Sequence, residues 1–250
     1  MNEHLPVDKT FKLFIGGAFP RSESGRTFAV RDAKGALLAN ASQASRKDLR
    51  EAVRAARGAQ ESWAGRTAYN RGQILYRAAE MMEARRPEFV SVLRQIGVTP
   101  KAASKQVDQA IDRWVWYAGW ADKTHHILGT VNPVAGPYFN FTFPEPTGVV
   151  GVMAPDEPAL LGLVSRLAAV IVSGNTAVAV VEGPASLAAI TLAEVLATSD
   201  LPGGVVNLLT GDKNELLPWM MGHLDINAVD LTGAPEDLDP TILEEAAVNV

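Results

Sequence analysis

The N-terminal part of the chain changes from short apolar runs to long helical periodicity. Over Phe11–Ala41, short apolar runs alternate with glycine-containing turns, which predicts small antiparallel strands and hairpins. Ser45 stands three residues before Asp48, a spacing typical of a capping box at the start of a helix. Three more helices are predicted over Asn70–Arg86, Pro87–Ile96 and Lys101–His125, the last broken only at Gly119.

The stretch Thr130–Thr142 has a different pattern. Aromatic and branched residues surround two turn dipeptides, Asn132-Pro133 and Gly136-Pro137. This pattern predicts a β-hairpin or a pair of extended strands. We therefore divide the chain into N-terminal strands and helices (residues 8–128), a hairpin (129–146) and βα units (147–250), the first and last belonging to one domain.

From Pro146 onward, short apolar runs alternate regularly with helical segments. Such alternation with short loops predicts an α/β fold with a Rossmann-type, doubly wound parallel sheet. The predicted strands are Gly148–Met153, Thr176–Val181, Val205–Leu209, Asn227–Leu231 and the beginning of another over Ala247–Val250. The predicted helices between them are Pro158–Ser173, Ala185–Thr198, Asp212–His223 and Pro235–Ala246.

Composition excludes several classes of function. The chain has 250 residues, a formal net charge of −5 and no cysteine. The acidic balance argues against nucleic acid or an anionic membrane as a partner. Without cysteine there are no disulfides, thiolate metal sites or thiol catalysis. The longest apolar run, Leu160–Val172, is interrupted by Ser165 and Arg166, so no membrane span is expected. Because Met1–Asp8 has no signal-peptide pattern, a cytoplasmic location is expected.

Parallel sheets of this kind bind ligands at the carboxyl ends of their strands, so the loops at that edge are the candidates for chemistry. No GxGxxG follows any predicted strand. The segment Thr232–Glu236 leads into the predicted helix at Pro235, where free N–H groups could hold a phosphate. Alternatively, this glycine has no binding role, because glycine is common in the turn before a helix.

Carboxylates gather in two of these loops. Asp156 and Glu157, with Asp212, could form a cluster for a metal or for acid–base chemistry, or they could simply cap helices. The histidines show no ligand spacing, so no metal site is predicted.

Taken in order, several segments resemble the N-terminal half of the aldehyde dehydrogenase superfamily. The similarity lies in "DLREAVRAARGAQESWAG" (Asp48–Gly65), "WYAGWADKTH" (Trp116–His125), "EPTGVVGVMAP" (Glu145–Pro155), "SGNTAVAV" (Ser173–Val180) and "LPGGVVNLLTG" (Leu201–Gly211). The segments "APDEPALLGLVS" (Ala154–Ser165) and "LTGDKNEL" (Leu209–Leu216) further resemble the non-catalytic second unit of tandem, sixteenth-family members.

The resemblance implies an aldehyde-dehydrogenase-like fold without its catalytic domain. In the family, the general base and the nucleophilic cysteine follow the strand that is expected to begin near Val250. The family's Pro-Trp-Asn-Phe-Pro loop aligns with residues 155–159, and its oxyanion-binding Asn aligns with Glu157. An ionised carboxylate there would repel the oxyanion by about 4 kcal/mol at a separation of about 4 Å. No catalytic residue is therefore assigned.

The cofactor contacts that the resemblance implies are also altered. The family's ribose-binding Lys-Pro-Ala-Glu aligns with residues 180–183, and its phosphate turn aligns with residues 233–238, where the first glycine remains but the hydroxyls and the last glycine do not. Pro235 also lacks a backbone donor. Tight binding of NAD(P) is not expected. The vestigial cofactor-binding residues are Pro155, Glu157, Gly211, Thr232 and Gly233.

These departures predict a pseudoenzyme subunit that associates with a catalytic NAD(P)-dependent aldehyde dehydrogenase and supports or regulates it. The resemblance implies that Thr130–Thr142 forms the oligomerisation sheet, so the expected partner is a full-length aldehyde dehydrogenase subunit in a hetero-oligomer. Two alternatives stay open. The chain could be a module that senses NAD(H), or a component of an active oxidoreductase complex with Asp156 or Glu157 as base.

Overall fold

The computed structural model describes residues 9–32, 34–237 and 240–247, and its centre is a four-stranded parallel sheet. The strands are β6 (Val149–Met153), β7 (Thr176–Val181), β8 (Val206–Thr210) and β9 (Ala228–Asp230). Their order is β8-β7-β6-β9. The chain adds β7 and β8 on one side of β6 and then crosses back to place β9 on the other side. This is the doubly wound arrangement that the alternating pattern predicts.

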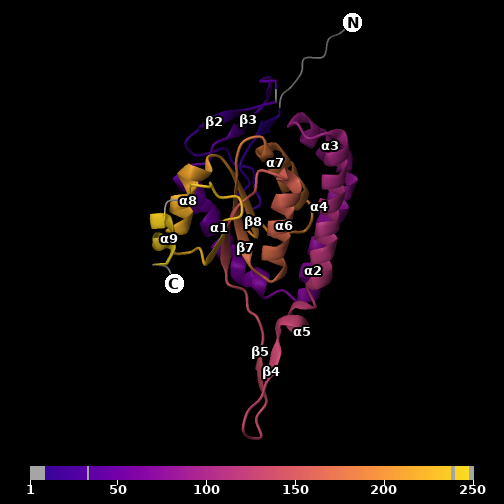
Figure 1. Cartoon of the computed structure of the whole chain (residues 1–250), viewed down its shortest axis with the longest axis vertical. Helices are drawn as coiled ribbons and strands as arrows, with labels where there is room; N and C mark the ends of the chain where they lie inside the picture. Colours follow the sequence, from indigo (N-terminus) through magenta and orange to yellow (C-terminus); the bar gives the residue numbers. More distant parts are fainter. Residues whose placement is uncertain (1–8, 33, 238–239, 248–250) are drawn as a thin grey trace.

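Helices cover both faces of this sheet (Figure 1). On one face lie α1 (Arg46–Ala64) and α8 (Lys213–Met221). On the other face lie α6 (Ala159–Val172) and α7 (Ala185–Leu196). A further layer packs against α6, formed by α2 (Ala68–Ala84), α3 (Arg86–Gln95) and α4 (Pro100–Trp120).

Strand β7 shows how the sequence produces this layering. All six of its residues are buried, because helices cover both sides. Ala177, Ala179 and Val181 belong to the hydrophobic cluster beneath α6 and α7. Val178 and Val180 point the opposite way, into the cluster beneath α1 and α8. The period-two alternation of a strand thus divides one apolar run between two cores.

The N-terminal sheet lies beside α7 and has the order β1-β3-β2, with β1 (Thr10–Phe11), β2 (Thr27–Arg31) and β3 (Leu37–Ser42). The predicted antiparallel pairing holds for β2 with β3 but is wrong for β1, which pairs in parallel with β3. The chain from β1 first runs beside β8, the outer strand of the central sheet, where Phe14 forms an antiparallel bridge with Leu208, before it returns to form β2.

Two predicted helix boundaries are corrected. Gly119 does not break the long helix; α4 continues to Trp120, and a turn over residues 121–123 separates it from α5 (Thr124–Leu128). The last described helix, α9 (Pro240–Ala247), begins at Pro240 instead of Pro235. Ala247 therefore ends a helix and starts no strand, while Val248–Val250 lie outside the described residues.

The predicted hairpin is confirmed as an antiparallel pair, β4 (Thr130–Asn132) and β5 (Asn140–Thr142). It projects away from the rest of the chain as a long arm (Figure 1). No helix among the described residues has the length and apolar character that a membrane crossing requires.

Candidate functional site

A cleft of about 700 Å³ opens where β6 and β7 end. The loop between β6 and α6 forms one wall, and the loop between β7 and α7 forms another. The connection from α3 to α4 closes a third side. The lining residues are Ile96, Gly97, Val98, Gln106, Asp156, Glu157, Pro158, Ala159, Glu182, Gly183, Pro184 and Ala185. The cleft therefore occupies the edge of the sheet at which folds of this kind bind ligands.

Gln106 of α4 fixes the wall formed by α6. The N-cap residue of α6 is Pro158, which makes no side-chain capping bond. Instead, the buried Gln106 side chain accepts a hydrogen bond from the N–H of Leu160 through Oε1, at 2.9 Å. This bond satisfies one of the N–H groups that a helix start leaves without a partner.

Lys213 and Asp156 form an ion pair beside the cleft. The Lys213 side chain is only 3% exposed, and its Nζ lies 2.7 Å from Oδ1 of Asp156, which is 65% exposed. The backbone N–H of Lys213 also faces the Glu182 carboxylate, at 3.5 Å. Burial raises the pKa of Glu182, and this hydrogen bond only partly offsets the effect. The cation at this edge is thus already paired with an acidic neighbour.

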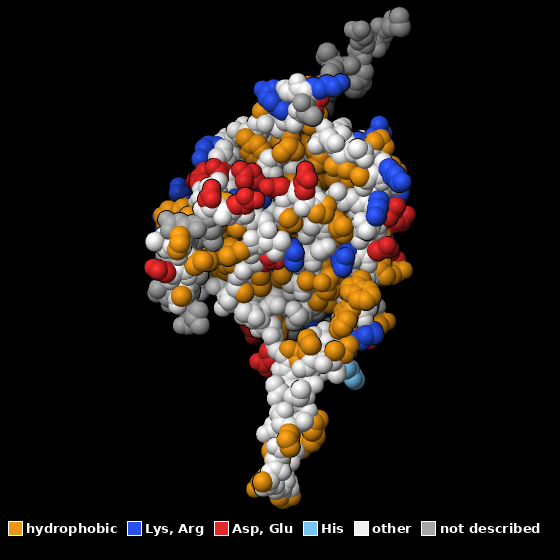
Figure 2. All heavy atoms as spheres, viewed as in Figure 1, with side chains coloured by type: hydrophobic (Ala, Val, Ile, Leu, Met, Phe, Trp, Pro, Cys, Tyr) orange, Lys and Arg blue, Asp and Glu red, His pale blue; other side chains and the backbone are white. Residues whose placement is uncertain are grey.

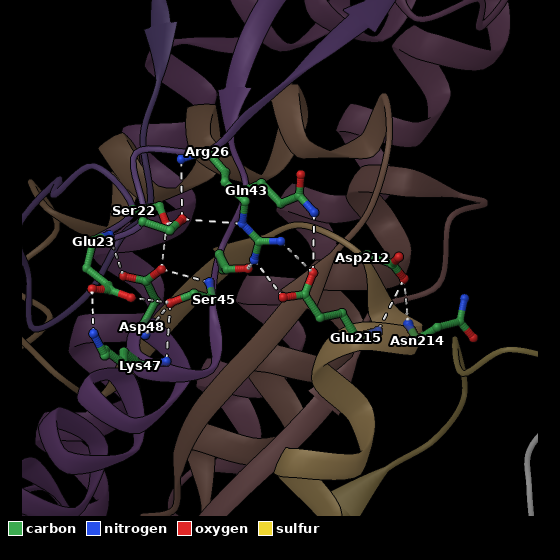
Figure 3. Close-up of polar contacts among 12 residues, drawn as sticks. Ser22, Glu23, Arg26, Gln43, Ser45, Lys47, Asp48, Asp212, Asn214 and Glu215 are labelled. Carbon is green, nitrogen blue, oxygen red and sulfur yellow. Dashed lines mark hydrogen bonds and ion pairs between the residues drawn. The ribbon is translucent and has the colours of Figure 1, made fainter.

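A polar network from the N-terminal sheet holds the first turn of α8 in place (Figure 3). The guanidinium of Arg26 donates two hydrogen bonds to the carboxylate of Glu215, at 3.1 and 2.6 Å. The amide of Gln43 reaches the same carboxylate. Asp212 caps the helix by accepting from the N–H groups of Asn214 and Glu215. Because both ends of this turn are tied, Lys213 is presented toward Asp156.

Of the five predicted cofactor residues, not all line the cleft. Glu157 lines the cleft. Pro155 packs behind the loop, where its ring fills the space beside Gly162. Gly211 donates its N–H to the carbonyl of Val181 and approaches the backbone of Ala44 closely. It is a packing position and lies outside the lining of the cleft.

Thr232 and Gly233 do not form the predicted phosphate cradle. The N–H and hydroxyl of Thr232 both donate to Oδ1 of Asp230. The N–H of Gly233 donates to the carbonyl of Met153, at 3.0 Å. Because the next helix begins only at Pro240, this turn is not a helix N-terminus. The predicted source of free N–H donors at Pro235 is therefore wrong.

The acids of the predicted carboxylate cluster take different partners. Asp212 serves as a helix cap, the simpler of the two interpretations. Asp156 pairs with Lys213 instead of with the other acids. No group of three metal-ligating side chains comes together within the described part of the chain.

Sequence reasoning missed Gln106, and although Glu182 and Lys213 belong to loops expected at this edge, it gave neither side chain a role there. Gln106 lies in the middle of a helix that carries no ligand motif, and Lys213 looks like any charged residue in a first turn. Only the approach of distant segments reveals their roles.

The comparison with family models decides what the chain is related to. The aldehyde dehydrogenase family model matches residues 19–248. The chain belongs to the aldehyde dehydrogenase family. The more specific resemblance to the second unit of tandem members stays a prediction.

Relatives across bacteria and animals agree with this assignment. The chain is 31% identical over 246 residues to a putative aldehyde dehydrogenase, DhaS, of Bacillus subtilis, with 96% of this chain and 49% of that protein covered. It is 32% identical over 234 residues to human retinal dehydrogenase 2, covering 91% of this chain and 45% of that protein. The chain therefore spans about half the length of these curated relatives.

A solved structure shows the same fold. The NAD⁺ complex of an aldehyde dehydrogenase from Bacillus cereus superposes with a TM-score of 0.87 at 28% identity, covering 96% of this chain and 49% of that one. The fold predicted from the sequence is confirmed. The Bacillus cereus enzyme in that structure is complexed with NAD⁺, which raises the question of whether this chain's cleft fits a dinucleotide.

The residues of the cleft do not fit a dinucleotide. A pyrophosphate is normally held by cations or by free N–H groups at a helix N-terminus. Among the described residues that line this cleft, the charged ones are Asp156, Glu157 and Glu182, all acidic. The nearby Lys213 is paired, and the Gly233 turn offers no helix start.

Proposed function

We propose that this chain is a non-catalytic subunit that docks onto a full-length aldehyde dehydrogenase subunit through the hairpin Thr130–Thr142 and supports or regulates it. A cytoplasmic location is part of this proposal. The observation that carries the proposal is the aromatic face that the hairpin exposes.

One face of the hairpin is polar and internally bonded. The side chain of Asn132 donates to Asn140 and to Thr142 across the two strands, at 3.0 and 2.8 Å. The hydroxyl of Thr130 donates to Asn132. These bonds fix the register of the pair without help from the rest of the chain.

The opposite face is aromatic and exposed. Phe139, Phe141 and Phe143 alternate along β5 and its extension, with neighbouring ring centroids 5.3 and 5.8 Å apart. Their exposed fractions are 75%, 54% and 46%. Val131, opposite Phe141 on β4, is 71% exposed. Exposure of such a row of rings to water is unfavourable, and the free energy falls when a partner covers them. Apolar side chains are visible along the arm in Figure 2.

The hairpin also offers backbone hydrogen bonds. Within the described residues β4 and β5 form a two-stranded sheet, so each strand keeps one open edge. Open edges accept an added strand, which supplies main-chain affinity while the aromatic face supplies apolar area. The family resemblance favours the matching hairpin of another aldehyde dehydrogenase subunit as the source of that strand.

The site chemistry supports a non-catalytic role. Glu157 stands where the family has an oxyanion donor, and an ionised carboxylate accepts hydrogen bonds but donates none.

Co-expression with a full-length aldehyde dehydrogenase from the same organism tests the proposal. The two chains should co-elute from a sizing column at micromolar concentration, with a defined mass by light scattering. The variant Phe139→Ser/Phe141→Thr should lose the complex, because both changed side chains lie on the exposed face.

A matched control changes two exposed aromatic side chains on α2, in Tyr69→Ser/Tyr76→Ser, and should keep the complex. The proposal fails if the unmodified chain elutes as a lone monomer beside the enzyme. It also fails if the hairpin variant binds as well as the control.

A further inference from the structure

The cleft at the ends of β6 and β7 differs in charge from a site for a phosphate-bearing cofactor. Glu157 is exposed and Glu182 is partly exposed, and both line the cleft. Asp156, the third acid, forms an ion pair with Lys213. Figure 2 shows acidic side chains gathered on the visible face between α8 and α7. A pyrophosphate entering here would meet carboxylates before it met any free cation.

The two helices that begin at the cleft are poor anion binders. The N-cap residues of α6 and α7 are Pro158 and Pro184, and proline has no N–H to donate. In α6, the N–H of Leu160 is already bonded to Gln106. In α7, the N–H groups of Ser186 and Leu187 close turns onto the carbonyls of Gly183 and Pro184. Several of the donors that would normally hold a phosphate are thus absent or occupied.

The N–H groups at the start of α8, the third helix that begins near this edge, are occupied as well. Asp212 accepts from the N–H groups of Asn214 and Glu215 at the start of α8. The N–H of Lys213 faces Glu182 instead of the cleft's open volume. A carboxylate therefore already takes the place that a phosphate would occupy at this helix.

The Gly233 turn is packed against the loop that follows β6. A Cβ built on Gly233 would lie 2.2 Å from the carbonyl oxygen of Ala154, and the N–H of Gly233 is bonded to Met153. The turn therefore offers no cradle of its own, and a diphosphate would have to bind in the cleft that Glu157 and Glu182 line.

From this geometry we infer that the cleft excludes NAD(P) and other diphosphate ligands, and that Glu157 and Glu182 are the residues that exclude them. The inference is independent of the hairpin, and it argues against a role for this chain as a sensor of NAD(H). The cleft lies at the edge of the sheet where folds of this kind bind ligands, but the charged residues that line it are acidic.

Calorimetry on the full chain with NAD⁺, NADH and inorganic pyrophosphate tests the inference. The unmodified protein should give no binding heat at millimolar ligand. The double variant Glu157→Gln/Glu182→Gln keeps the side-chain shapes and removes both charges. It should gain measurable binding of NAD⁺ and of pyrophosphate, with affinity rising about tenfold for each carboxylate removed.

The control Glu51→Gln/Glu80→Gln changes the net charge equally on exposed positions of α1 and α2, away from the cleft, and should behave like the unmodified protein. Thermal melting of both variants establishes that they are folded. Micromolar binding of NAD⁺ by the unmodified chain would overturn the inference. Failure of the double variant to gain binding would overturn the assignment of exclusion to these two carboxylates. Neither result bears on assembly through the hairpin.

Discussion

The ammonium group of Lys213 lies 2.7 Å from the carboxylate of Asp156, although the lysine is almost fully buried and the aspartate is mostly exposed. The pair joins the loop after β6 to the first turn of α8, two segments 57 residues apart. A buried ammonium without a partner is costly, so Asp156 holds the loop that forms one wall of the cleft.

Removing the acid should therefore destabilise the fold. We expect Asp156→Ala to lower the free energy of unfolding by about 1–3 kcal/mol, since it leaves the Lys213 ammonium buried and unpaired. Lys213→Met should be nearly neutral, because an apolar chain of similar shape needs no partner. Urea denaturation measures both changes. Adding Lys213→Met to Asp156→Ala should restore most of the loss; a double variant as unstable as Asp156→Ala alone would contradict the pairing.

The capping box of α1 also makes contacts outside the helix. The buried Asp48 carboxylate accepts from Ser45 N–H, from the Ser22 hydroxyl and from Glu23 N–H, at 2.7, 2.7 and 3.1 Å (Figure 3). Asp48→Ala should cost about 2–3 kcal/mol of unfolding free energy, because several donors lose their acceptor. The exposed Asp112 on α4 provides the control, and Asp112→Ala should change stability by less than about 0.5 kcal/mol. Equal effects of the two changes in chemical denaturation would refute the network.

Two glycines give opposite expectations for one substitution. Gly233→Ala should destabilise by about 1–3 kcal/mol, because its Cβ would overlap the backbone of Ala154 and force the loop to move. Gly58→Ala should stabilise by about 0.5–1 kcal/mol, since Gly58 lies inside α1 and nothing stands within 4 Å of the new Cβ. Differential scanning calorimetry compares them. If the Gly233→Ala protein had the same melting temperature as the unmodified protein, the turn would not be packed as described.

Glu182 should give the protein a stability that falls as pH rises. Burial raises the pKa of this carboxyl above its ordinary value of 4.5, so the folded state holds the proton more tightly than the unfolded chain. Stability is then lost as pH rises from 4.5 through the folded-state pKa. Glu182→Gln should remove that loss, making the variant more stable than the unmodified protein at neutral pH but not at acid pH. Denaturation at several pH values checks this; a stability difference that does not vary with pH would contradict it.

Glu194 should show the opposite dependence. Burial raises the pKa of its carboxyl, but hydrogen bonds from Lys9 and Arg85 outweigh burial and leave the pKa lowered. The contribution of these ion pairs is present above the ordinary pKa of 4.5 and is lost as pH falls through the folded-state pKa. Glu194→Gln should therefore be less stable than the unmodified protein at neutral pH, and the two should converge in acid. The same pH series measures this difference in stability. Equal stability of the two proteins at neutral pH would contradict the prediction.

Local patterns determined most of the fold from the sequence alone. The Ser45–Asp48 spacing predicts a capping box, which forms as expected. The apolar run Thr176–Val181 predicts a buried strand with the observed bounds. These features depend on hydrogen bonds and side-chain periods within a few residues, so neighbouring residues are enough to specify them. The hairpin predicted over Thr130–Thr142 is likewise a local feature, and the structure shows polar side chains pairing across its two strands.

The tertiary structure decided the charge and the limits of the cleft. Gln106 accepts a hydrogen bond from the N–H of Leu160, 54 residues later, and Lys213 pairs with Asp156, 57 residues earlier. The sequence placed Glu157 at this edge but also predicted a helix start at Pro235 that the structure moves to Pro240. Long-range partners depend on how whole layers pack, and no local period encodes which side chain a distant loop will meet. The sequence thus determined the layers, their edge and the carboxylates of its loops, while packing decided that Lys213 would be paired there and that Gln106 would occupy the start of α6.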